Sequence, residues 1–483
     1  MNDLARQLDR VMPAGLTGSV IRTEGLIAAV AGLPAPVGAV VEIERQSGPP
    51  ISAEVIGFRQ QQTLVYPLGE MTGVRRGNRV RLVRTARYLR VGRELLGRVV
   101  DAHANVLDAR ALPHTTERVT IERRPPAPVD RPRIDVPLST GVRAIDGLLT
   151  CGRGQRMGIF SGSGVGKSVA LGMMARYTAA DVNVIALIGE RGREVNEFLQ
   201  RDLGESGLAR SVVVVATSDE PAVLRVRAAM TATAVAEYFR DSGSDVLLMM
   251  DSLTRFATAQ REIGLAAGEP PTTRGFPPSV FAMLPRLVER AGRAARGSIT
   301  AFYSVLVEGD DPNEPISDAV RGLLDGHILL SRKLAARGHY PAIDVLESIS
   351  RLMPDVATPP QRAAAVAVRE LLAAYRDHED LISVGAYRAG SNAAVDAAIA
   401  LREEIDRYLR QAVEEQSSLE SARDELLALA QRCMAAKGAV ARASAPAVPA
   451  IATAPSRPPT AATATARAPR TIPTRKSTAA PSR

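Results

Sequence analysis

The sequence is poor in aromatic residues and in cysteine. Of its 483 residues, 4% are aromatic and none is Trp, which weakens any function that depends on stacked bases or on an aromatic cage. The two cysteines, Cys151 and Cys433, lie far apart and offer neither a disulfide framework nor a metal-ligand spacing. We expect both to be small buried or half-buried side chains of a protein from a reducing compartment.

Long apolar runs are also missing. No stretch approaches the roughly 18 residues that are needed to span a bilayer. Residues 1–13 carry charges throughout, unlike a secretory signal. We therefore expect a soluble cytosolic protein, one that is able to lie against a membrane surface.

Acidic residues are absent from residues 438–483, so the net charge of the chain is concentrated in this stretch. The formal charge is +9, but seven basic residues lie in this stretch, so residues 1–437 carry only +2. The stretch also holds 8 of the 32 prolines and is otherwise mostly Ala, Thr and Ser. It has too little large apolar surface to offset its ordering entropy, so we predict a disordered tail. A nearly neutral folded part argues against a nucleic-acid platform.

The rest of the chain is long enough for two to four domains of roughly 100–200 residues each. After a short amphipathic segment at 1–15, β-rich runs broken by Gly and Pro over 16–98 indicate a small β-barrel. Apolar strand cores alternate with helical patterns over 99–361, which indicates a parallel sheet covered on both faces. Residues 362–437 have the apolar spacing of helices. The expected core strands are Met157–Phe160, Val184–Ile188, Val212–Ala216, Val246–Met250 and Ile299–Val305.

A glycine-rich run, Ser161-Gly-Ser-Gly-Val-Gly-Lys-Ser168, lies between a predicted strand and a predicted helix. This context is that of a phosphate loop, in which glycines let several backbone N–H groups point at phosphate oxygens. Lys167 can reach the β- and γ-phosphates and the Ser168 hydroxyl can bind Mg²⁺. The first position is usually Gly and here is Ser161, a small residue that the turn still accommodates. The predicted phosphate-binding residues are Gly162, Ser163, Gly164, Val165, Gly166, Lys167, Ser168 and Val169.

Two carboxylates follow apolar strands. Asp251 ends the strand 246–250, and on a parallel sheet it lies at the edge where ligands bind, so we expect it to hold Mg²⁺ through water. Glu190 follows the strand 184–188 and can polarise the water that attacks the γ-phosphate. Arg191 can lie near the phosphates. The alternative for Glu190 and Arg191 is a charged loop closed by a local salt bridge.

The segment 75–98 contains nine arginines and one acid. It is either the solvated outer face of strands or a docking face for an acidic partner or a lipid surface.

Several runs together resemble the catalytic subunits of the rotary ATPase family, which includes F-type, V-type and type III secretion ATPases. They are Gly189–Arg191, Asp251–Phe256, Pro270–Gly275 and Pro341–Arg351, and the resemblance spans about 16–437. Runs at 151–158, 175–178, 260–269 and 338–344 resemble the flagellar export ATPases in particular, although virulence secretion ATPases share much of them. The resemblance implies an α/β fold: a RecA-like parallel-sheet core, an N-terminal β-barrel and a helical C-terminal domain.

The resemblance also implies roles for single residues. Glu190 would be the catalytic carboxylate, and Arg191 and Arg255 would flank the phosphates. Tyr340 would lie near the adenine of ATP, with Tyr387 as a second aromatic. Arg351 would be an arginine finger that reaches into the neighbouring subunit's site. The alternatives for Tyr340 and Arg351 are a packed ring and a surface ion pair.

One chain type that carries both Glu190 and Arg351 could build six complete sites, so the resemblance implies a homohexamer that uses ATP and Mg²⁺. The implied function is ATP hydrolysis that energises the unfolding and export of flagellar proteins at the inner face of the cell membrane. The implied partners are a regulatory stator-like protein at the N-terminus, the export gate and stalk protein, and chaperone–cargo complexes at 362–437. No nucleic-acid partner is expected.

Four other functions compete with this one. They are a virulence type III secretion ATPase, an ATP synthase catalytic subunit, a hexameric nucleic-acid translocase and a non-catalytic nucleotide sensor. Glu190 argues against the last of these, because a sensor needs no residue to activate water.

Overall fold

The computed structural model describes residues 15–85, 88–307 and 314–443. The predicted segment 1–15 therefore falls outside the described residues except for its last residue, and the predicted tail falls outside them from Ser444 onward. The last helix, α15 (Leu419–Ala443), continues past the predicted end of the helical domain at 437. In the described part of the chain no helix is both long and apolar enough to cross a membrane.

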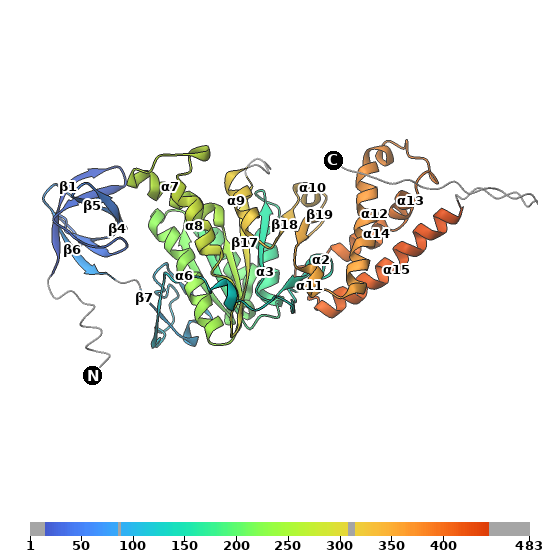
Figure 1. The fold of residues 1–483 in the computed structure, drawn as a ribbon, viewed down its shortest axis with the longest axis horizontal. Coiled ribbons are helices and arrows are strands. Elements are labelled where there is room, and N and C mark those ends of the chain that lie inside the picture. Colours follow the sequence, from blue (N-terminus) through green and yellow to red (C-terminus); the bar gives the residue numbers. More distant parts are fainter. Residues whose placement is uncertain (1–14, 86–87, 308–313, 444–483) are drawn as a thin grey trace, which may run out of the picture. The chain divides into compact units, whose positions relative to one another are not determined.

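The N-terminal region is a closed barrel of six antiparallel strands, drawn in blue in Figure 1. The barrel closes in the order β1-β2-β5-β4-β3-β6, so it leaves no free edge. Small apolar side chains such as Val30, Val41 and Val65 fill its interior. Its strands are β1 (Thr17–Glu24), β2 (Ile27–Ala31), β3 (Val40–Ile43), β4 (Ile51–Arg59), β5 (Gln62–Pro67) and β6 (Arg79–Arg84).

The predicted barrel range of 16–98 is longer than the barrel itself, whose last strand ends at Arg84. Strand β7 (Tyr88–Val91) pairs with β9 (Glu117–Thr120), and β8 (Arg98–Val100) joins the central sheet beside β14 (Ser211–Thr217). A short β-rich run carries no signal of which sheet it will join. Of the nine arginines in 75–98, Arg98 is buried and ion-paired with Asp108, Arg87 lies outside the described residues, and the rest are exposed.

The central sheet confirms the predicted RecA-like core. Its order is β19-β18-β12-β17-β15-β13-β14-β8, with β16 beside β17. All pairings are parallel except those of β19 and β16. Each predicted strand core lies within one of its strands. The strands not yet given are β12 (Arg156–Ser161), β13 (Val182–Glu190), β15 (Asp245–Asp251), β16 (Gly292–Arg293), β17 (Ser298–Leu306), β18 (Gly326–Leu330) and β19 (Ile343–Ser350).

Both faces of this sheet are covered because successive side chains of a strand point to opposite faces. In β13, Val184 and Ala186 pack into one apolar cluster, and Ile185 and Leu187 into another. The first cluster includes α6 (Ala222–Asp241), α7 (Leu253–Ala267), α8 (Pro278–Val288) and α9 (Pro315–Leu323), several of which lie side by side in Figure 1. The second includes α2 (Arg143–Leu148), α3 (Lys167–Tyr177), α4 (Gly192–Glu197) and α5 (Gly204–Ala209).

The C-terminal region is helical, as predicted. It consists of α12 (Pro359–Ser383), α13 (Ala393–Ala400), α14 (Arg402–Leu409) and α15. Thr358 caps α12 and Asn392 caps α13 by accepting backbone N–H groups, which fixes where each helix begins. These helices share the second apolar cluster with α2. Cys151 and Cys433 are both buried and unpaired, which confirms their expected structural role.

Short elements complete the described chain. They are η1 (Arg93–Leu95), η2 (Pro128–Asp130), β10 (Pro137–Leu138), β11 (Cys151–Gly152), the π-helical turn η3 (Phe198–Leu203), η4 (Thr273–Gly275), α10 (Arg332–Ala336) and α11 (Met353–Val356).

Candidate active site

The phosphate loop lies between β12 and α3, where the sequence places it. Gly164 and Gly166 have φ values of 77° and 85°, a backbone region that residues with side chains rarely adopt. Val165 is 2% exposed and anchors the loop in the core. Lys167 is the first residue of α3, so the loop ends at a helix N-terminus, which favours bound anions.

Three charged side chains meet at the carboxyl ends of β12, β13 and β15. Lys167 Nζ donates a hydrogen bond to Asp251 Oδ1 and lies 3.8 Å from Glu190 Oε1. All three side chains are largely buried. Ser304 of β17 donates to the same Asp251 oxygen at 2.6 Å, which holds that carboxylate in place. The structure thus brings together Lys167 and the two carboxylates, Glu190 and Asp251, that the sequence places at the phosphate loop.

Glu190 has an unusual protonation equilibrium. Burial, together with the negative charge of Asp251, raises its pKa to about 7 against the opposing positive charge of Lys167. Glu190 also shares a hydrogen bond with Glu194, and this bond lowers the pKa of Glu194. A carboxyl group with a pKa near 7 is suited to proton transfer at neutral pH.

The oxygen donors at this point fit a magnesium ion. Ser168, Glu190 and Asp251 line a cavity of about 80 Å³, and a hydroxyl with a carboxylate is the kind of hard donor set that Mg²⁺ prefers. Within the described ranges no group of three or more His, Cys, Asp or Glu residues is placed to hold a metal.

The two predicted phosphate-flanking arginines lie in different environments. The Arg255 side chain packs over Gly189, with its Cβ 3.1 Å from where a Cβ on that glycine would be. Its charge lowers the pKa of Glu190, and its buried Nε has no hydrogen-bond partner among the described residues. Arg191 is 78% exposed and forms an ion pair with Glu194 at 3.3 Å. In this structure Arg191 therefore forms the local salt bridge that was the alternative to a position near the phosphates.

The ring of Tyr340 lies against the phosphate loop. Its Cδ1 and Cε1 atoms are 3.4 Å from the position that a Cβ on Gly166 would take. The residue is 46% exposed, so part of it remains accessible to a ligand. Tyr387, in contrast, is tied to the C-terminal helices: its hydroxyl donates to Asp396 Oδ1 at 3.0 Å, and its ring packs edge-on to His378.

Arg351 follows directly after β19 and is exposed. Its backbone N–H donates to the carbonyl of Asp325. Within the residues that the structure describes, its guanidinium has no hydrogen-bond or ion-pair partner, so the surface ion pair that was its alternative is not seen among them.

Sequence reasoning missed two members of the site. Ser304 is, like Thr300, a hydroxyl-bearing residue inside the mostly apolar predicted strand 299–305, and this break in the pattern was the available signal. Glu194 lies one helical turn after Glu190, a spacing at which side chains meet on a helix, but the pair spans a strand end and a helix start.

Comparisons with known proteins agree with this geometry. Residues 141–350 match the model of the ATP synthase alpha/beta family nucleotide-binding domain, and residues 357–428 match that of the T3SS EscN ATPase C-terminal domain. The flagellum-specific ATP synthase of Bacillus subtilis is 52% identical over 405 residues, which cover 83% of this chain and 92% of that protein. The type 3 secretion system ATPase of Xanthomonas euvesicatoria is 51% identical over 419 residues, which cover 86% and 95%.

Solved structures give the same result. The assembled ATPase EscN of the enteropathogenic E. coli type III secretion system superposes with a TM-score of 0.82 at 46% identity, and the match covers 86% of this chain and all of that one. The same ATPase in complex with its central stalk EscO superposes with a TM-score of 0.79 at 45% identity, and that match too covers 86% of this chain and 100% of its counterpart.

A phosphate loop on a RecA-like sheet, with a carboxylate poised beside its lysine, defines a P-loop ATPase. The chain belongs to the ATP synthase alpha/beta family. Within that family it is an ATPase of the group that includes the flagellum-specific and type III secretion ATPases.

Proposed function

We propose that this ATPase energises flagellar type III export, hydrolysing ATP to drive the unfolding and export of flagellar proteins. The observation that carries the proposal is the near-complete match to flagellum-specific ATPases. The Salmonella typhimurium protein, for example, is 50% identical over 424 residues that cover 92% of its length. A virulence type III secretion ATPase is the second candidate, favoured by the EscN likeness and by the Xanthomonas relative.

The chemistry follows from the charged cluster. Glu190 is the residue we assign to orienting the attacking water and taking its proton, because its raised pKa matches that task. Lys167 exchanges its contact with Asp251 for the β- and γ-phosphates when ATP binds, and it stabilises the charge of the transition state. Bound Mg²⁺, held by Ser168 and by Asp251 through water, would neutralise charge on the phosphate oxygens.

Tyr340 is proposed to stack on the adenine, because its ring lies against the phosphate loop and the residue is partly exposed. Arg255 is proposed to face the phosphates with its buried Nε, which no described residue contacts by a hydrogen bond. Arg191 would reach the phosphates only by leaving Glu194. Tyr387 would have to leave Asp396 to reach a nucleotide, so we place it outside the site.

Arg351 is proposed to complete the active site of a neighbouring copy of the chain. It is exposed, and among the described side chains none neutralises it, as suits a finger that acts in trans. One chain type then supplies every part of each site, which favours a homohexamer. The description of EscN as an assembled ATPase supports this assembly.

The remaining partners and the location are proposed from the relatives. EscN is described in complex with its central stalk, so we propose a stalk protein for this ring as well. We further propose a stator-like regulator at 1–15, chaperone–cargo complexes on the C-terminal helices, and a cytoplasmic position against the inner membrane face near the export gate. The exposed arginines of 75–93 are suited to an acidic surface there.

Deletion and complementation of the gene test the proposed function. The deletion strain should lose extracellular flagellin and swimming, wild type should restore both, and Glu190→Gln should not. Loss of virulence-effector secretion with intact flagella would move the assignment to the second candidate. A deletion that leaves both secretion systems intact would overturn both.

A further inference from the structure

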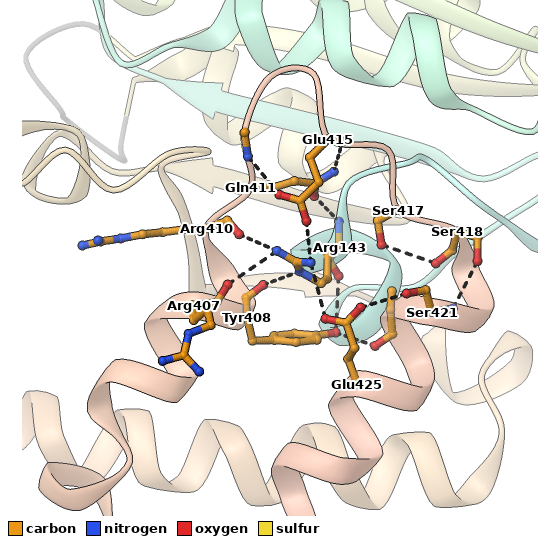
Figure 2. Close-up of polar contacts among 12 residues, drawn as sticks. Arg143, Arg407, Tyr408, Arg410, Gln411, Glu415, Ser417, Ser418, Ser421 and Glu425 are labelled. Atoms are coloured by element: carbon orange, nitrogen blue, oxygen red, sulfur yellow. Dashed lines mark hydrogen bonds and ion pairs between the residues drawn. The ribbon is translucent and has the colours of Figure 1, made fainter.

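Arg143, at the start of α2, lies among residues of the C-terminal helices (Figure 2). It is 9% exposed. Its guanidinium donates to the carbonyls of Arg410 at 2.7 Å, Tyr408 at 2.9 Å and Arg407 at 3.5 Å. These carbonyls belong to the end of α14, where the last C=O groups of a helix lack intrahelical partners. Arg143 therefore caps α14 from another part of the chain, and its positive charge suits the helix C-terminus.

Gln411, Glu415 and Glu425 also contact Arg143, and these four residues together are called the Arg143 node. Arg143 Nη1 lies 2.7 Å from Glu415 Oε1 and 3.4 Å from Glu425 Oε2. The side-chain carbonyl of Gln411 accepts the backbone N–H of Arg143 at 2.7 Å, and its amide donates to Gly141 O at 2.8 Å. The segment 407–415 is thus bound to the start of α2 by both side chains and backbone, as Figure 2 shows.

The same segment also contacts both elements that hold the nucleotide in the proposed site. The backbone N–H of Gln411 donates to the carbonyl of Tyr340 at 3.0 Å. Two residues further on, the carbonyl of Val413 accepts hydrogen bonds from Arg176 at 2.7 Å and from the Tyr177 hydroxyl at 3.2 Å. Arg176 and Tyr177 form the last turn of α3, the helix that begins at Lys167.

Arg143 and Tyr340 also line one cavity. The cavity has a volume of about 1190 Å³, and Gln411 and Ala412 of the same segment form part of its wall. A shift of the segment 407–415 would therefore change the space beside the Tyr340 ring and the support of α3 together.

We propose that Arg143 is a positioning residue for ATP: by fixing the segment 407–415 against Tyr340 and α3, it sets the affinity of the site for the nucleotide. The inference rests on the proposed adenine contact of Tyr340. Arg143 touches neither the phosphate loop nor Glu190, so its loss weakens ATP binding while the chemical step at saturating ATP stays nearly unchanged.

Nucleotide binding can be measured directly because the chain has no Trp. Tyr340→Trp gives a single fluorescent reporter beside the phosphate loop, and its signal is titrated with ATP in the full chain. We expect Arg143→Gln in this background to raise the Kd for ATP about tenfold, within the usual range of coupling between sites. With Tyr340 intact, Arg143→Gln should raise KM by a similar factor and change kcat less than about twofold.

Arg98→Gln is the matched control. Arg98 is also a buried arginine; it pairs with Asp108 at 2.7 Å and donates to the carbonyl of Ala111 at 3.0 Å. It lies on β8, at one edge of the central sheet, and none of these partners belongs to the Arg143 node. Its loss should lower the unfolding temperature and leave Kd and KM at their wild-type values. Arg143→Lys keeps the positive charge but not the planar fork of donors, so its Kd and KM should lie between those of wild type and of Arg143→Gln.

Unchanged Kd and KM in a folded Arg143→Gln protein would overturn the proposal and leave Arg143 a structural residue like Arg98. If Arg143→Gln does not fold, Gln411→Ala removes a second bond of the same node and must raise KM in the same direction. An ATP-insensitive signal in Tyr340→Trp would refute the adenine contact alone, because the KM of Arg143→Gln with Tyr340 intact still tests the positioning role.

Discussion

Replacing Glu190 with Gln removes an ionisable group from a position that disfavours its charge. Burial and the negative charge of Asp251 together raise the pKa of Glu190 from the 4.5 of a free side chain to about 7. The folded chain then binds more protons at Glu190 than the unfolded chain, so between pH 4.5 and about 7 this group lowers stability as the pH rises. Gln has the same shape, stays neutral, and can donate to Glu194 as the protonated acid does.

The size of this effect follows from the pKa shift. At about 1.4 kcal/mol per pKa unit, a charged Glu190 costs roughly 3 kcal/mol, which the partial exposure of the site reduces to about 2 kcal/mol. Glu190→Gln should therefore be about 2 kcal/mol more stable than wild type at pH 8 and equally stable near pH 4.5. It should also lose about 10²–10⁴-fold in ATP hydrolysis, the usual contribution of a general base.

Calorimetric unfolding without nucleotide, run at pH 5 and pH 8, measures the first effect, and phosphate release measures the second. Glu194→Gln is the control, because its pKa is lowered and its charge therefore stabilises the folded state above pH 4.5. That variant should be less stable than wild type at pH 8. A Glu190→Gln protein that is less stable than wild type at pH 8, or whose advantage does not depend on pH, would refute this account of Glu190.

Three further predictions concern other contacts. Ser304→Ala should lower kcat and cost about 1 kcal/mol in unfolding free energy, because Asp251 loses a buried hydrogen bond; steady-state kinetics and calorimetry check this, and unchanged kinetics would contradict it. Arg351→Ala should lower kcat about 10³-fold or more at concentrations where rings form, while ATP binding by single chains stays intact; full activity there would remove the trans finger. Glu54 of β4 and Arg227 of α6 form a buried ion pair; Glu54→Gln leaves Arg227 beside a neutral partner and should cost about 3–5 kcal/mol in calorimetric unfolding, and a loss below about 1 kcal/mol would show that the pair contributes little.

The centre of the site was predictable because each of its parts is a short sequence motif at the end of a parallel strand. Glu190 and Asp251 each end an apolar strand, and the phosphate loop follows a third, so one sheet edge had to collect them. The barrel boundary was not predictable, because β8 resembles a barrel strand and its partner β14 lies far along the chain.

Contacts between residues that are far apart along the chain also could not be predicted from the sequence. Arg143 and Gln411 are 268 residues apart, and neither stands out in its local pattern. In the sequence, Arg143 looks like an ordinary charged residue at the start of a helix, and Gln411 looks like a polar residue in a loop. Only the folded chain shows that these two residues connect the C-terminal helices to the nucleotide site.

A mixing experiment tests the central claim, that each active site is shared between neighbouring copies of one chain. Glu190→Gln and Arg351→Ala proteins are each expected to be nearly inactive. Mixed in equal amounts and allowed to assemble, they should regain ATPase activity, up to about a quarter of wild type for random rings, because some sites combine an intact Glu190 with a neighbour's intact Arg351. If the mixed rings form and stay as inactive as each variant alone, the shared site is contradicted.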